Sequence, residues 1–132
     1  MSTDPKDVAV AFLSLGAQGK MEEAIALLAD EVEFWYTGVK DVTRDDLVAG
    51  MRGMAQIIIP GGGIEVVDIL EEDGRVAIEY KGRIPLATGK VYANTYHTKI
   101  VVKDGKITVM REYLDPLIVM DAFGGMSSAN PE

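Results

Sequence analysis

The chain has 132 residues, enough for one compact domain of ordinary size. Hydrophobic residues make up 48% of it and charged residues 26%, which excludes a disordered, collagen-like or coiled-coil protein. The formal net charge of −8 argues against binding to nucleic acid or to an anionic membrane surface.

The reactive side chains are equally restricted. There is no cysteine and only one histidine, so we expect no disulfide, no thiol nucleophile, no metal site and no cofactor. No apolar run approaches the roughly 20 residues of a membrane-spanning helix. The first residues also lack the basic and apolar regions of a secretory signal, and we therefore expect a cytoplasmic protein.

The first half of the chain carries helical patterns. Asp-Pro-Lys-Asp at 4–7 is typical of a helix start, and apolar residues follow at helical spacing. A second, short helix is predicted at about residues 21–28, and a strand at 31–36 from its β-branched and aromatic residues. A third helix is predicted behind the capping box at 43–46 and ends before the glycines at 61–63.

The second half predicts a meander of four strands. Its turns are Asp-Gly at 73–74, Thr-Gly at 88–89 and Asp-Gly at 104–105, of which the middle one is the weakest hairpin signal. We expect one domain over residues 1–123 and a flexible tail at 124–132. Helices followed by consecutive strands favour an α+β fold, in which the helices cover one face of a curved, mostly antiparallel sheet.

The turns also predict which side chains face one another. A two-residue turn at 104–105 places His97 opposite Glu112, and one at 88–89 places Tyr80 opposite His97. Because strand side chains alternate between the two faces, the three would form one polar row on one face. A β-bulge would shift Tyr80 out of this row, whereas the pairing of His97 with Glu112 depends only on the stronger turn.

The two faces of the predicted sheet differ in character. The face with the polar row is otherwise apolar, as the wall of a pocket would be. The opposite face is too apolar for bulk water and predicts a homodimer interface. The residues expected in this interface are Tyr92, Tyr96, Ile100, Val109 and Tyr113.

Three stretches, taken in order and spacing, resemble a known family. They are Ala-Leu-Leu-Ala-Asp-Glu-Val at 26–32, Gly-Lys-Val-Tyr-Ala-Asn-Thr-Tyr-His at 89–97, and residues 104–115 from Asp-Gly-Lys-Ile to Arg-Glu-Tyr-Leu-Asp. They are similar to the SnoaL-like polyketide cyclase and ketosteroid isomerase branch of the nuclear transport factor 2-like superfamily. The resemblance implies a cone-shaped half-barrel, a pocket for a small lipophilic molecule, and dimerisation through the outer sheet surface.

The resemblance transfers only part of a catalytic site. The tyrosine and the two aspartates of the ketosteroid isomerases fall at Phe12, Tyr36 and His97, so their mechanism is not implied. The arginine–aspartate pair of the limonene epoxide hydrolases is absent as well. The acid that those hydrolases share with the SnoaL-like cyclases matches Glu112, which keeps a carboxylate on a side chain one methylene longer.

The apolar wall and the resemblance together predict a pocket for a small lipophilic molecule. Aromatic and methionine side chains would give it an adaptable lining, and Lys99 would reach towards its mouth. The expected lining residues are Phe12, Phe34, Tyr36, Met51, Met54, Ile78, Lys99, Met110 and Leu114.

The leading hypothesis is cofactor-independent acid–base catalysis of an isomerisation, cyclisation, dehydration or epoxide hydration. Glu112 and His97 would move protons, while Tyr80 and Tyr36 would orient the substrate or stabilise an oxyanion. One alternative is a ligand-binding module that uses the same pocket without turnover, in which the polar pair only satisfies itself. Another is an accessory dimerisation domain whose own side chains fill the cavity.

Overall fold

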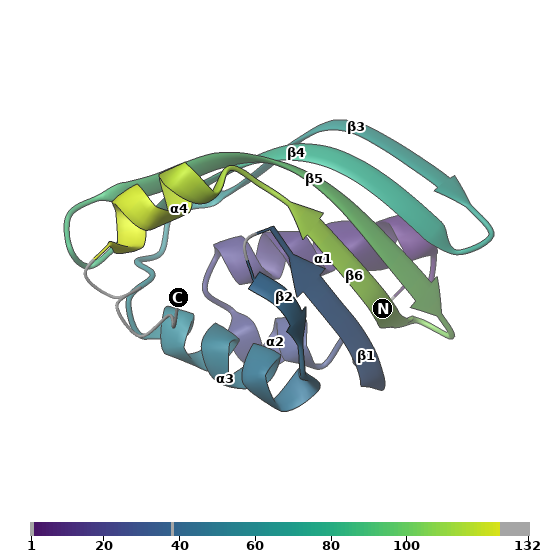
Figure 1. The fold of residues 1–132 in the computed structure, drawn as a ribbon. Helices are drawn as coiled ribbons and strands as arrows, with labels where there is room; N and C mark the ends of the chain where they lie inside the picture. Colours follow the sequence, from purple (N-terminus) through teal and green to yellow (C-terminus); the bar gives the residue numbers. More distant parts are fainter. Residues whose placement is uncertain (1, 38, 125–132) are drawn as a thin grey trace.

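The computed structural model describes residues 2–37 and 39–124, which form one curved sheet of six strands and four helices (Figure 1). The tail predicted from residue 124 onwards lies, except for Gly124, outside this range. In chain order the elements are α1 (Pro5–Ala17), α2 (Met21–Ile25), β1 (Leu28–Tyr36), β2 (Val39–Val42), α3 (Arg44–Ala55), β3 (Gly63–Glu72), β4 (Arg75–Pro85), β5 (Val91–Lys103), β6 (Lys106–Tyr113) and α4 (Pro116–Phe123).

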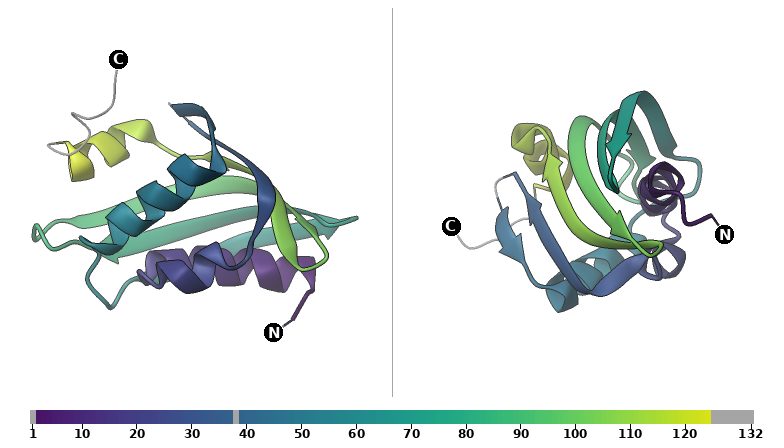
Figure 2. Two further views of the ribbon diagram at one scale, coloured as in Figure 1. Left: turned by 90° about the horizontal axis from the view of Figure 1, so that it is seen from below. Right: turned by 90° about the vertical axis from the view of Figure 1, so that its right-hand side faces the viewer.

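The sheet has the strand order β2-β1-β6-β5-β4-β3 and curls without closing. All neighbours are antiparallel except β1 and β6, which run parallel. The helices α1, α2 and α3 lie on the concave side, and α4 follows β6 at one end of the sheet (Figures 1 and 2). The predicted α+β half-barrel is confirmed. None of the described helices is long and apolar enough to span a bilayer.

Capping side chains begin the helices where the sequence predicts. The Asp4 carboxylate accepts a hydrogen bond from the backbone N–H of Lys6, and Pro5 opens α1. The Thr43 hydroxyl accepts one from the backbone N–H of Asp46 at the start of α3. These contacts satisfy N–H groups that have no partner inside the helix. Both predicted helix starts are confirmed.

Two short elements were not predicted. The strand β2 lies at one edge of the sheet beside β1. The helix α4 begins at Pro116 and is capped by Asp115, whose carboxylate accepts a hydrogen bond from the N–H of Leu117. The helix predicted at 21–28 is also shorter than expected. It ends at Ile25, and Leu28 already belongs to β1.

The register of β5 against β6 differs from the prediction. The turn at 104–105 pairs Lys103 with Lys106 as expected. A β-bulge in β6 then shifts the pairing by one residue, because Val102 pairs with Ile107 but Val101 pairs with Val109, which leaves Thr108 as the extra residue. The prediction that His97 lies opposite Glu112 is therefore wrong, because His97 lies opposite Tyr113 and Glu112 lies opposite Thr98.

The register of β5 against β4 differs as well. A loop over residues 86–90 replaces the two-residue turn, so that Pro85 pairs with Val91 and Tyr80 pairs with Tyr96. A shift of one residue moves every side chain to the other face. The side chains of Tyr92, Tyr96 and Ile100 consequently point inward and are buried.

The predicted dimer face is thus wrong for its three β5 residues. Val109 and Tyr113 are on the outer side of β6, where the Tyr113 ring lies 4.9 Å from that of Trp35. The Arg111 guanidinium lies 4.6 Å from the Trp35 ring. The homodimer itself stays a prediction.

The centre of β4 contributes buried side chains to the hydrophobic core. Ile78 has no exposed surface, whereas Leu70 on the neighbouring β3 is 66% exposed. We expect Ile78→Ala to lower the free energy of unfolding by about 2–5 kcal/mol, because the lost methyl groups leave a cavity. The control Leu70→Ala should cost less than about 1 kcal/mol. Urea denaturation measures both, and equal effects would contradict the assignment of Ile78 to the core.

Candidate active site

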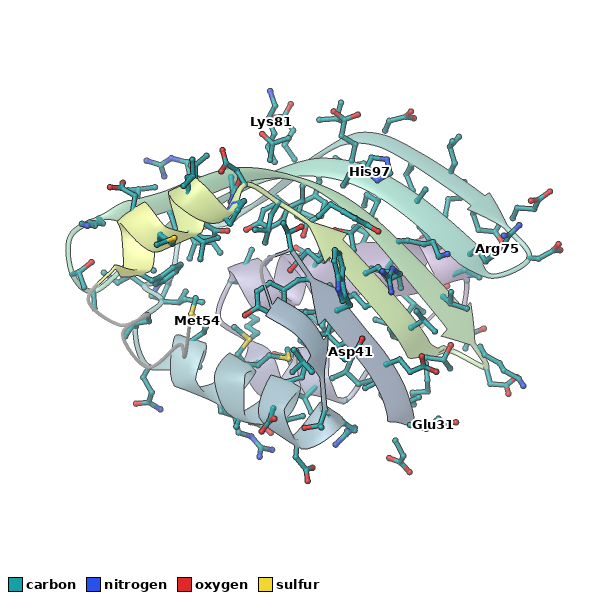
Figure 3. All side chains as sticks on the ribbon, in the orientation of Figure 1. Glu31, Asp41, Met54, Arg75, Lys81 and His97 are labelled. Carbon is teal, nitrogen blue, oxygen red and sulfur yellow. The ribbon has the colours of Figure 1, made fainter. Side chains whose placement is uncertain are left out.

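A cavity of about 600 Å³ lies between the concave face of the sheet and the helices. Residues of all four helices and all six strands form its wall, which is mainly apolar. In Figure 3, Met54 extends from α3 towards the sheet. Of the predicted lining residues, those in this wall are Phe12, Phe34, Tyr36, Met51, Met54, Met110 and Leu114.

Three predicted site residues are not in the cavity. His97 and Lys99 are exposed on the outer face of β5, because the register shift turned both away from the concave side (Figure 3 labels His97). Ile78 does face inward, but it is completely buried in the core and does not line the cavity. The proposed imidazole–carboxylate pair therefore does not form.

The polar centre of the cavity is a carboxyl group held by a phenol. The Tyr80 hydroxyl donates a hydrogen bond of 3.0 Å to the Glu112 carboxylate. Tyr36 is the partner of Glu112 in the parallel ladder between β1 and β6 and also lines the cavity. The register therefore joins Tyr80 to Glu112 directly, without the histidine expected between them.

Burial controls the proton affinity of this carboxyl group. Removal from water raises the pKa of Glu112 to about 7, and the hydrogen bond from Tyr80 opposes this increase by stabilising the carboxylate. The pKa of Tyr80 is well above its ordinary value, first because of burial and then because of the charge of Glu112. Burial and the same charge raise the pKa of Tyr36. Near neutral pH, Glu112 gains and loses a proton while both phenols keep theirs.

A second polar cluster lies on β5, at residues that the sequence predicted on the outer face of the sheet. The Tyr96 and Tyr92 hydroxyls are 2.8 Å apart, and the Asn94 amide donates a hydrogen bond of 3.0 Å to Tyr92. The Tyr96 ring stacks on that of Tyr80 with centroids 4.6 Å apart. The loop after β4 turns these side chains inward, and the weak Thr-Gly turn signal at 88–89 did not reveal its length.

The charged side chains found in the described part of the cavity wall are all acidic. They are Glu112 and, in addition, Asp41 and Asp46 (Figure 3 labels Asp41). In the described ranges no three histidine, aspartate or glutamate side chains come together as a metal site would require. The arrangement can exchange a proton with a bound molecule through Glu112 and donate hydrogen bonds from tyrosines.

The raised pKa of Glu112 predicts a pH-dependent stability. A folded-state pKa of about 7, above the ordinary 4.5, means that the neutral side chain stabilises the fold. This stabilisation is complete below pH 4.5 and is lost as the pH rises through 7. Because Glu112→Gln stays neutral, its free energy of unfolding should rise relative to wild type by up to roughly 3 kcal/mol between pH 4.5 and pH 8.

Urea denaturation at several pH values measures this difference. Glu33→Gln, which removes the same charge from an exposed position of β1, is the control for net charge. A difference between wild type and Glu112→Gln that does not change with pH would contradict the raised pKa.

Comparisons with known proteins agree with this architecture. Solved structures with the same fold include PrhC from Penicillium brasilianum (TM-score 0.79, 14% identity, 97% of this chain and 92% of that chain covered) and a putative isomerase from Bacillus subtilis (0.79, 19%, 95% and 97%). An epoxide hydrolase from Mycobacterium tuberculosis that resembles limonene epoxide hydrolase is also similar (0.73, 20%, 96% and 92%). A search of the curated protein sequences finds no match. The model of the SnoaL-like domain matches residues 9–110, and the chain therefore belongs to the SnoaL-like domain family.

Proposed function

We propose that this protein is an enzyme in which Glu112 acts as the single general acid and base on a small lipophilic substrate. The observation that carries the proposal is a carboxyl group with a pKa of about 7 in an apolar cavity, hydrogen-bonded to Tyr80. A general base works best when its pKa lies near the working pH. The reaction class is an isomerisation, cyclisation, dehydration or epoxide hydration without a cofactor.

The proton transfers follow from the contacts. The ionised carboxylate takes a proton from a carbon acid or from water, and the neutral carboxyl then returns it to another atom of the substrate. Tyr80 donates to the carboxylate and so stabilises the ionised form. None of the described side chains accepts a hydrogen bond from the Tyr36 hydroxyl, so this hydroxyl is available to a developing oxyanion.

Similar folds support the reaction class without fixing it. The structurally similar proteins include a putative isomerase, a putative hydroxylase from Streptomyces galilaeus and an epoxide hydrolase. The cavity volume of about 600 Å³ lies within the range of small-molecule sites, which argues against a cavity filled by the protein's own side chains. A ligand-binding module without turnover is the competing function.

The test is turnover of a panel of ketones, aldol substrates and epoxides. We expect Glu112→Gln to lower kcat/KM by at least about 100-fold, the usual contribution of a general acid or base. His97→Ala should retain the wild-type rate because His97 lies outside the cavity. Unchanged activity in Glu112→Gln would reject Glu112 as the acid–base group, and binding without turnover across the panel would reject the enzymatic function.

The pH profile separates a catalytic role of Glu112 from a structural one. If ionised Glu112 is the base, kcat/KM rises with pH through an inflection near 7. Tyr80→Phe removes the hydrogen bond that lowers the pKa of Glu112, so the inflection should move to higher pH. An inflection that does not move in Tyr80→Phe would contradict the coupling between the two side chains.

We also propose a homodimer through the outer sheet face, with an interface around Tyr113 and without the three buried residues of β5. The support is an exposed aromatic surface, in which Tyr113 is 46% exposed and packs against Trp35. Sedimentation of the wild type and of Tyr113→Lys tests it. A dimer that Tyr113→Lys weakens is expected, and a monomeric wild type would contradict the proposal.

A further inference from the structure

Three polar side chains of β5 form a cluster inside the protein, separate from the Glu112 carboxyl. Tyr92, Asn94 and Tyr96 are only 6%, 5% and 8% exposed. Both tyrosines line the cavity. Because buried polar groups need hydrogen-bond partners, each donor and acceptor in the cluster can be accounted for.

The donors of Asn94 are all used. Its side-chain oxygen accepts a hydrogen bond of 2.9 Å from the backbone N–H of Thr95, which fixes the orientation of the amide. The amide nitrogen then donates to the Tyr92 hydroxyl at 3.0 Å and to the backbone carbonyl of Asp115 at 3.1 Å. Tyr92 must therefore accept from Asn94.

The two tyrosine hydroxyls have one hydrogen more than their contacts use. They lie 2.8 Å apart, and a single hydrogen bond between them uses one of their two hydrogens. No group in the described part of the chain accepts the other hydrogen, whichever hydroxyl carries it. Tyr80 differs, because its hydrogen is donated to Glu112. The acceptor for the remaining hydrogen must come from the contents of the cavity.

We propose that the Tyr92–Tyr96 pair is an oxygen-binding site that donates a hydrogen bond to a carbonyl, hydroxyl or ether oxygen of the ligand. The proposal rests on the proposed function and narrows its substrate class to lipophilic molecules that carry such an oxygen. A cation has no lone pair to offer this donor. A carboxylate would be repelled by the acidic side chains of the wall, where the described residues include no lysine, arginine or histidine.

The site lies directly beside the acid–base group. The rings of Tyr96 and Tyr80 stack nearly parallel, with an interplanar angle of 6°, and Tyr80 donates to Glu112. Gly82 leaves room for this stack, since a Cβ atom there would approach the Tyr96 ring to 3.2 Å. An oxygen bound at the tyrosine pair would thus hold the ligand next to the carboxyl that moves the proton.

The experiment compares 1-tetralone with tetralin, which has the same ring system without the carbonyl oxygen. It is done at pH 9, where Glu112 has lost the proton that it could otherwise donate to the ketone. Tyr92 and Tyr96 keep theirs, because burial raises the pKa of both phenols. Calorimetry gives the dissociation constants, and infrared spectroscopy of bound tetralone reports the hydrogen bond through the carbonyl stretching frequency.

We expect wild type to bind tetralone about tenfold more tightly than tetralin, the effect of about one net hydrogen bond. The carbonyl stretching frequency of tetralone bound to wild type should lie below its frequency in an alkane solvent. The double variant Y92F/Y96F should lose both effects and still bind tetralin. Each single variant should keep the lowered frequency, because one hydroxyl hydrogen remains free in either case. Tyr113→Phe, on the outer face, is the matched control and should behave as wild type.

Four results would overturn the proposal: no tetralone binding, no lowered frequency in wild type, a lowered frequency that persists in the double variant, or its loss in Tyr36→Phe instead. If the double variant does not fold, the single variants still test whether one free hydroxyl hydrogen remains at the tyrosine pair. Binding and frequency are measured without turnover, so a lowered frequency in a protein that catalyses nothing would reject the proposed enzymatic function alone.

Discussion

The register of β5 decides what the cavity contains. This strand pairs with β4 on one side and β6 on the other, and its residues alternately face inward and outward, with Tyr92 and Tyr96 lining the cavity. The loop before β5 sets which of its residues face inward, and the bulge at Thr108 of β6 sets which residues of β6 share that face. One step of difference would place His97 and Lys99 inside and expose Tyr92 and Tyr96. The side chains that reach the cavity thus depend on these two irregularities in the backbone.

The pKa of Glu112 is set by two opposing effects of its surroundings. Burial favours the proton, whereas the Tyr80 hydroxyl favours its loss, and the balance places the pKa near neutrality. A histidine is therefore not needed for proton transfer at neutral pH. Tyrosine side chains have a large ring with apolar faces and a polar hydroxyl at one end. They therefore supply hydrogen bonds in a wall that is otherwise apolar.

The sequence allowed the elements to be predicted better than the contacts between them. Caps such as Asp4 and Thr43, and the Asp-Gly turns, are local signals, and the structure follows them. Glu112 could be predicted because the family resemblance matched its position to a catalytic acid and the Asp-Gly turn at 104–105 marked the start of β6. The errors concern His97 and the β5 tyrosines, whose face depends on the length of the loop before β5 and whose partners on β6 depend on a bulge in that strand. No local residue type encodes either, since both result from the packing of the whole sheet.

The parallel contact between β1 and β6 also has a consequence for how the chain acquires its structure. Leu28 lies beside Ile107, and Tyr36 beside Glu112, so strands from opposite ends of the sequence meet in the middle of the sheet. During synthesis, β1 leaves the ribosome long before β6 exists, whereas its other neighbour, β2, follows it directly. Contacts over such sequence separations form late and slow folding. One edge of β1 therefore stays unpaired until β6 has been made, and only then does Glu112 come to lie beside Tyr36.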